Sequence, residues 1–250
     1  MKIRWYGTAS FSVETKETKL LFDPYVPLRG SKVKTKVEDY AGFKNIVITH
    51  AHFDHIGSIP MLFKAEPREI YGTQATYTAL RKLGIPKEHI HIIAPGDELC
   101  FGDIKVKAYQ GRHIKYDKKL LRRTVFNWRI IRYFINFVKT GLLSLKCKEK
   151  QETMGYLIEA EGKKIFAMGS LNLDENTEYP TYMDCLILPY QGRSDLLTPA
   201  LEVIGKLKPK AVALISGMLY LRKKDMSGIF LSGMFCGSGE RRKKAEPYFD

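Results

Sequence analysis

Three histidines and an aspartate crowd the end of an apolar stretch, and this run constrains the fold of the 250-residue chain more than any other feature. His50-Ala51-His52-Phe53-Asp54-His55 directly follows Asn45-Ile46-Val47-Ile48-Thr49. A continuous apolar run of this length is typical of a strand buried on both faces. We therefore expect the cluster to lie where a central strand ends and the chain turns.

The spacing of these residues indicates a metal site. Residues two apart in an extended chain point the same way, so His50 and His52 can aim both imidazoles at one point. Asp54 and His55 lie beyond the strand end and can reach a second point. Imidazole and carboxylate are ligands of Zn²⁺ and similar metals, and open catalytic sites use three protein ligands plus water. His113 can complete a three-histidine set; the alternatives are a surface cluster without metal and an ordinary loop histidine.

The rest of the chain alternates strand and helix patterns. Residues 27–40 read as a polar, lysine-rich loop, and helices are expected at Thr73–Leu83 and Thr198–Leu207. His89 and His91 alternate around a short strand and are interpreted as structural. The expected strands are Lys2–Tyr6, Phe11–Thr15, Lys19–Phe22, Asn45–Thr49, Ile90–Ile93, Ile104–Tyr109, Met154–Ala160, Lys164–Met168, Cys185–Pro189 and Ala211–Ser216. Strands in two batches, with helices between and after them, predict an α/β (α+β) domain of sheets covered by helices.

The net charge of +14 is concentrated in two segments. Residues 112–150 hold 12 basic and 2 acidic side chains, a net +10, and residues 222–250 carry a net +3. Residues 118–139 form a basic amphipathic helix pattern with a broad aromatic and aliphatic face. Three interpretations stay open for it: an insertion packed on the body, a lid that attracts an anionic substrate group, or contact with an anionic membrane surface. Nucleic acid is not favoured, because the aromatic residues lie on the apolar face.

Compartment signals are few. The chain starts without a secretory h-region, and its longest apolar stretch, Val125–Val138, is interrupted by Arg129 and Arg132. Its four cysteines are far apart, with no CxxC pair. These features favour reduced thiols and a cytoplasmic protein. They predict no oligomeric state.

Four motifs resemble one family. The run His50–His55 matches the HxHxDH signature of the metallo-β-lactamase superfamily. Trp5–Phe11, Leu20–Pro24 and Leu188–Asp195 resemble the branch of L-ascorbate-6-phosphate lactonase and related metal-dependent hydrolases. The resemblance covers roughly residues 1–112 and 151–216. It implies an αββα sandwich with one or two metal ions at the sheet edge, and a metal-bound hydroxide that attacks an ester, lactone or phosphodiester.

The resemblance also implies roles for single residues. His50, His52 and His113 would hold one metal ion, zinc in the first place and manganese as the alternative. Asp54 and His55 would hold a second ion. Asp54 would also orient the nucleophilic water and pass protons, which makes it the expected catalytic residue.

The chain departs from the family pattern at several positions. Ser170 stands where the family has a bridging carboxylate, and Asp174 could substitute only if its loop folds back. Thr8 stands where relatives often have histidine. The family's last metal histidine is missing, because no histidine follows His113. The likeness ends at Ser216, and we interpret the ending beyond it as atypical.

The expectation is thus a metallo-β-lactamase-like domain over residues 1–216, with a basic helical insertion at about 114–150 and an atypical tail at 217–250. Its predicted function is metal-dependent hydrolysis of a small, anionic substrate. The alternative is a catalytically impaired binding protein of the same fold that lacks the second metal site.

Overall fold

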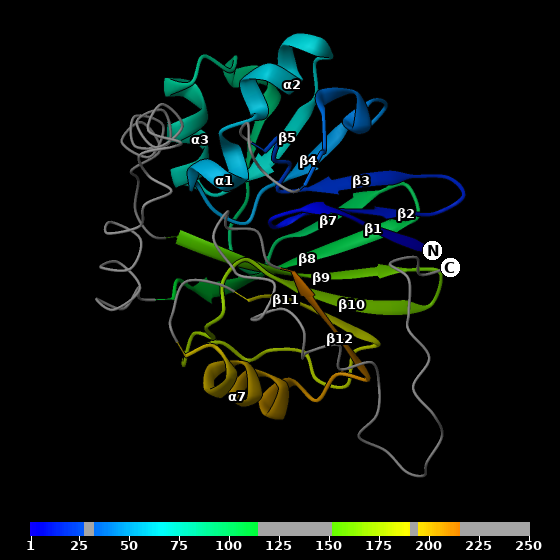
Figure 1. Ribbon diagram of the computed structural model, residues 1–250, viewed down its shortest axis with the longest axis vertical. Coiled ribbons are helices and arrows are strands. Elements are labelled where there is room, and N and C mark those ends of the chain that lie inside the picture. Colours follow the sequence, from blue (N-terminus) through cyan, green and yellow to red (C-terminus); the bar gives the residue numbers. More distant parts are fainter. Residues whose placement is uncertain (28–32, 115–151, 191–194, 216–250) are drawn as a thin grey trace.

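The computed structural model describes residues 1–27, 33–114, 152–190 and 195–215. Two six-stranded sheets pack face to face, with helices on the outer face of each (Figure 1). The layers are therefore helix, sheet, sheet and helix, which confirms the predicted αββα sandwich.

The first sheet has the order β1-β2-β3-β4-β5-β6. Its first three strands form an antiparallel meander, and β3 to β6 run parallel. The strands are β1 (Lys2–Gly7), β2 (Ser10–Glu14), β3 (Lys19–Phe22), β4 (Asn45–Val47), β5 (Glu69–Gly72) and β6 (Ile90–Ile92). The parallel strands are connected by α1 (Phe53–Ile56), α2 (Ile59–Ala65), α3 (Gln74–Lys82) and the 3₁₀ helix η2 (Lys87–His89).

The second sheet has the order β12-β11-β10-β9-β8-β7. Its strands β7 to β10 are antiparallel, and β10 to β12 are parallel. They are β7 (Glu98–Phe101), β8 (Ile104–Arg112), β9 (Glu152–Ala160), β10 (Lys163–Met168), β11 (Cys185–Pro189) and β12 (Ala211–Ile215). Helix α7 (Leu197–Leu207) connects β11 to β12 and covers the outer face. Each sheet thus joins an antiparallel part to a parallel part.

Three apolar clusters fill the spaces between the layers. Phe22, Val47 and Tyr156 belong to the cluster between the sheets, whereas Leu21 and Ile46, their neighbours in sequence, pack beneath α1, α2 and α3. A third cluster packs the outer face of the second sheet against α7. Neighbouring residues face different clusters because side chains alternate along a strand. Strands buried on both faces therefore read as continuous apolar runs.

The structure corrects parts of the sequence prediction. Residues 27–40 are not loop throughout, because Val37–Tyr40 forms the 3₁₀ helix η1. The ring of Tyr40 is fully buried, and its hydroxyl contacts the Ser10 hydroxyl at 2.9 Å. Strands β5 and β7 and the short helices α1 and α2 were not predicted. The predicted helix at Thr73–Leu83 is confirmed as α3, with the Thr73 hydroxyl accepting a hydrogen bond from the Thr76 amide.

Two predicted segments lie outside the described residues. They are most of the basic insertion, including residues 118–139, and the tail from 217 to 250. The proposed boundaries at 1–216, about 114–150 and 217–250 therefore stay a prediction. Within the described ranges, every helix is too short or too polar to cross a membrane.

Candidate metal centre

Three histidines from two segments converge where the sheets meet. His50 and His52 follow β4, and His113 follows the last residue of β8. One ring nitrogen from each lies within 4.8 Å of the others. The His52 ring centroid is 4.5 Å from those of both His50 and His113. Within residues 1–27, 33–114, 152–190 and 195–215, this is the one group of three such donors close enough to share a metal ion.

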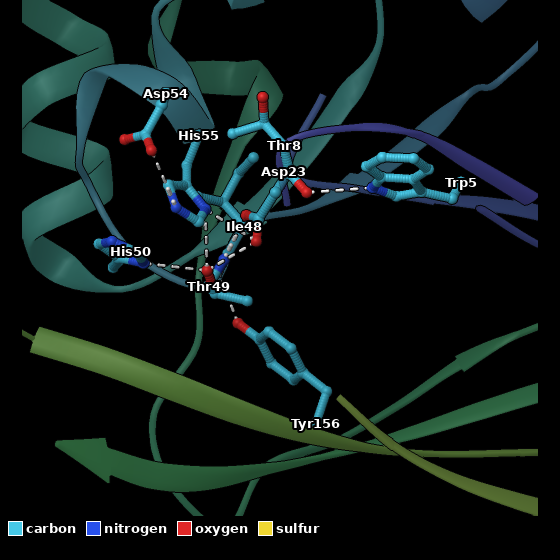
Figure 2. Close-up of polar contacts among 9 residues, drawn as sticks. All are labelled: Trp5, Thr8, Asp23, Ile48, Thr49, His50, Asp54, His55 and Tyr156. Atoms are coloured by element: carbon cyan, nitrogen blue, oxygen red, sulfur yellow. Dashed lines mark hydrogen bonds and ion pairs between the residues drawn. The ribbon is translucent and has the colours of Figure 1, made fainter. Parts of the chain in front are cut away.

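Hydrogen bonds to neighbouring residues orient two of these rings, and Figure 2 shows those around His50. The Thr49 hydroxyl donates its proton to Asp23 Oδ2 at 2.7 Å and therefore accepts from His50 Nδ1, 3.0 Å away. His113 Nδ1 donates to the carbonyl of Ile114 at 2.8 Å. A neutral imidazole carries one proton, so both Nε2 atoms keep a lone pair. Second-layer partners of this kind fix the orientation of metal-binding histidines.

The surroundings favour the neutral form of all three histidines. Burial, followed by the charges of His55, His52 and His113, holds the pKa of His50 well below its usual range. Burial and the neighbouring His113 lower the pKa of His52, and burial lowers that of His113. Metals bind the neutral imidazole. The donor set therefore fits a divalent metal.

Asp54 and His55 lie beside this group in the first turn of α1. His55 Nδ1 is 2.9 Å from Asp23 Oδ2, and His55 Nε2 is 3.9 Å from Asp54 Oδ2. Burial lowers the pKa of His55, but the charges of Asp23 and Asp54 and the hydrogen bond to Asp23 outweigh it, so the pKa is raised. The Asp54 charge partly opposes the lowering of the pKa at His52 and His113, so this carboxylate acts on two of the three histidines.

The family departures have distinct places in the structure. Ser170 is buried at the end of β10, and its hydroxyl accepts a hydrogen bond from the Ile114 amide at 2.9 Å. Asp174 Oδ2 instead accepts from the Asn176 amide and the Thr177 hydroxyl, so it caps its own turn. Thr8 is buried just past β1 with a positive φ of 54°.

Sequence reasoning missed Asp23 and Thr49 as parts of the site. Asp23 Oδ1 accepts from the Thr49 amide at 2.8 Å, so this carboxylate holds both Thr49 and His55. A signal was present, because Asp23 ends β3 just as Thr49 follows β4. Adjacent parallel strands place such residues at the same edge of a sheet.

A seam between the sheets supports Thr49 from the other side. The Thr49 carbonyl accepts from the Met154 amide at 2.9 Å, and the Tyr156 hydroxyl donates to the Ile48 carbonyl at 2.7 Å (Figure 2). Gly169 fits against the seam because it has no side chain, since a Cβ there would lie 2.6 Å from Thr49 Cβ. The histidine-bearing loop is thus built against the second sheet.

The remaining two histidines lie apart from this group. His89 Nδ1 and His91 Nε2 contact the two oxygens of Glu69, at 2.8 and 2.6 Å. The His91 ring stacks on Tyr71. These contacts tie β5 to η2 and β6, as expected for a structural role.

A family model described as a beta-lactamase superfamily domain matches residues 18–215, most of the chain. The chain belongs to this superfamily. A UPF0173 protein of Pyrococcus abyssi is 37% identical over 113 residues, which are 45% of this chain and 50% of that relative. A UPF0173 metal-dependent hydrolase of Polynucleobacter asymbioticus is 26% identical over 223 residues, covering 84% of this chain and 72% of the relative.

The solved structures agree on the fold. Igni18, described as a novel metallo hydrolase from Ignicoccus hospitalis, superimposes with a TM-score of 0.54 at 18% identity, covering 86% of this chain and 81% of that one. The superfamily resemblance drawn from the motifs is confirmed. The narrower likeness to the lactonase branch stays a prediction.

Proposed function

We propose that this chain is a metal-dependent hydrolase that cleaves an ester, lactone or phosphodiester bond in an anionic small molecule. The observation that carries the proposal is the convergence of three neutral imidazoles from His50, His52 and His113. The name of the Polynucleobacter relative, a metal-dependent hydrolase, supports the reaction class. Zinc is the ion we expect, because imidazole ligands suit zinc, and manganese, which prefers carboxylate and water, is the alternative.

The chain's own residues divide the work. A divalent metal held by His50, His52 and His113 would act as a Lewis acid and would lower the pKa of a bound water toward about 7. The Asp54 carboxylate lies beside the histidines and serves as the group that orients the attacking water and accepts its proton. Thr49 and Ile114 hold the rings of His50 and His113 in the ligating orientation. Asp23 anchors His55 behind Asp54.

The anionic substrate is inferred from charge near the site. The basic segment 112–150 begins beside His113 with a net +10. Its first member, Arg112, pairs with the exposed Glu175 at 2.8 Å and so is already engaged. The proposed attraction of an anionic substrate therefore depends on the basic residues of the segment that follow Arg112. Contact of residues 118–139 with a membrane surface remains the competing proposal for this charge.

The function is tested with chelator-stripped protein reloaded with zinc or manganese. We expect turnover on generic phosphodiester or lactone substrates, lost with the metal and restored by it. His50→Ala should lose both metal and activity, and Asp54→Asn should keep the His50-His52-His113 metal but lose activity. His91→Ala is the matched control, because this histidine contacts Glu69 outside the site. Hydrolytic activity in the His50→Ala variant equal to that of the wild type would contradict the proposal.

A binding protein of the same fold is the rival proposal, favoured by Ser170 in the place of a family carboxylate. It predicts that the wild-type chain loads metal like an enzyme but turns over neither substrate class. Metal content and turnover, measured on the same preparation, separate the two.

A further inference from the structure

We propose that this centre takes one divalent cation rather than two, and that Ser170 is a positioning residue for His113 and not a ligand. The inference rests on the proposed function, because it concerns the metal of that same site. The family resemblance implies one or two metal ions, and this inference narrows the number to one.

The first ground is the place and bonding of Ser170. It follows Gly169 at the end of β10, is 6% exposed, and accepts the Ile114 amide proton at 2.9 Å. The Ile114 carbonyl in turn accepts from His113 Nδ1. The Ile114 amide is therefore held by the serine, and the Ile114 carbonyl by the ring of His113.

The second ground is the number of donors left for another ion. Asp54 and His55 offer two, a carboxylate oxygen and Nε2, 3.9 Å apart. The nearby Asp23 carboxylate is already shared by the Thr49 amide, the Thr49 hydroxyl and His55 Nδ1. Asp174 is bonded within its own turn.

In the described part of the chain, no third His, Cys, Asp or Glu joins Asp54 and His55. A neutral serine hydroxyl that accepts an amide proton is a poor substitute for a carboxylate, because divalent ions of this class prefer imidazole, thiolate and carboxylate. Ser170 therefore helps to position His113 for the first ion, and it supplies no charged ligand for a second. Among the described residues, the centre is complete for one ion and incomplete for two.

The number of metal ions per chain is tested on the wild-type protein by elemental analysis and by zinc titration after the metal has been removed with a chelator. We expect one equivalent per chain. Two tightly bound equivalents would overturn this inference and leave the proposed hydrolase intact. Failure to bind any zinc would overturn the proposed function itself.

The role of Ser170 is tested by zinc affinity in a chelator competition. Ser170→Ala should still bind one equivalent but at least tenfold more weakly, because loss of a second-layer partner typically costs 10–100-fold in affinity. Thr153→Val is the matched control. Its hydroxyl is buried against the same small cavity as Ser170 but has no hydrogen-bond partner among the described residues. Equal affinities in the two variants would overturn the positioning role.

Ser170→Asp supplies the missing charge. The longer side chain keeps an acceptor for the Ile114 amide and adds a carboxylate at the position where the family pattern has one. We expect this variant, once its circular dichroism shows a native fold, to bind a second equivalent of zinc. A folded variant that still binds one equivalent would overturn the inference that Ser170 leaves the second site incomplete.

Discussion

Thr49→Val tests whether the hydroxyl of Thr49 holds the metal centre together. Valine keeps the shape of threonine, so packing against Gly169 changes little, but the hydroxyl that joins Asp23 to His50 is lost. Asp23 Oδ2 keeps its contact with His55, whereas His50 Nδ1 is left buried without its acceptor. The main cost is therefore one lost bond to a charged group and one orphaned donor.

The magnitude follows from those two losses. A hydrogen bond to a charged group contributes about 1.5–3 kcal/mol, and an unsatisfied buried donor costs about 1–3 kcal/mol. These terms overlap, so we expect the free energy of unfolding to fall by about 3 kcal/mol. For a chain of this size, each kcal/mol shifts Tm by roughly 2–4 °C. The metal-free variant should therefore melt about 6–12 °C below wild type, and its zinc affinity should fall about 10–100-fold.

The assay is thermal melting in chelator followed by zinc competition, with Thr49→Ser as the control. Serine keeps the hydroxyl, so it should lie close to wild type in both measurements. If Thr49→Val and Thr49→Ser behaved alike, the hydroxyl network would not position His50 and the reasoning would be wrong.

Four further variants examine the seam, helix α7 and the contact of Glu69 with His89 and His91. Gly169→Ala places a Cβ 2.6 Å from the Cβ of Thr49 and should lower the free energy of unfolding by about 1–3 kcal/mol. Gly205→Ala, at a position on α7 with no neighbouring atoms, should instead raise it by about 0.5–1 kcal/mol. Tyr156→Phe loses the hydrogen bond to the Ile48 carbonyl. Its free energy of unfolding, measured by denaturant titration, should fall by about 1 kcal/mol, and the number of zinc ions bound per chain should stay the same. The hydrogen bond from His91, opposed by burial and helped by His89, lowers the pKa of Glu69. A lowered pKa stabilises the fold above the unfolded value, near 4.5. The Tm gap between wild type and Glu69→Gln should therefore be small but present at pH 6–7, and should shrink as the pH falls below about 4; a gap that widened in acid would contradict this.

The sequence predicted the metal-binding residues of the site better than the residues that hold them in place by hydrogen bonds. The apolar run before His50 and the spacing of His50 and His52 predict a shared point at a strand end, because strand periodicity is local. His113 was predicted only as a candidate, since its approach depends on how two sheets pack. Asp23 and Thr49 act through hydrogen bonds between segments that lie far apart in the chain, and no local periodicity encodes them.

The same distinction explains the missed elements. Strand β5, with the sequence Glu69-Ile70-Tyr71-Gly72, is short and ends in glycine, so its pattern resembles a turn. Its strand conformation is set by pairing with β4 and β6. Tyr40 lies in a lysine-rich segment, yet its ring is buried because Tyr6 and Phe43 pack around it. Tertiary contacts decide both cases.

The seam between the sheets also couples metal capture to folding. Of the three expected metal ligands, His50 and His52 belong to the first sheet, whereas His113 and its partner Ser170 belong to the second. A metal held by all three histidines would therefore stabilise the docked arrangement of the two sheets, since this ligand set is complete only in the docked state. We therefore expect removal of the metal to weaken the docking of the two sheets and to expose their apolar facing surfaces to other chains more often.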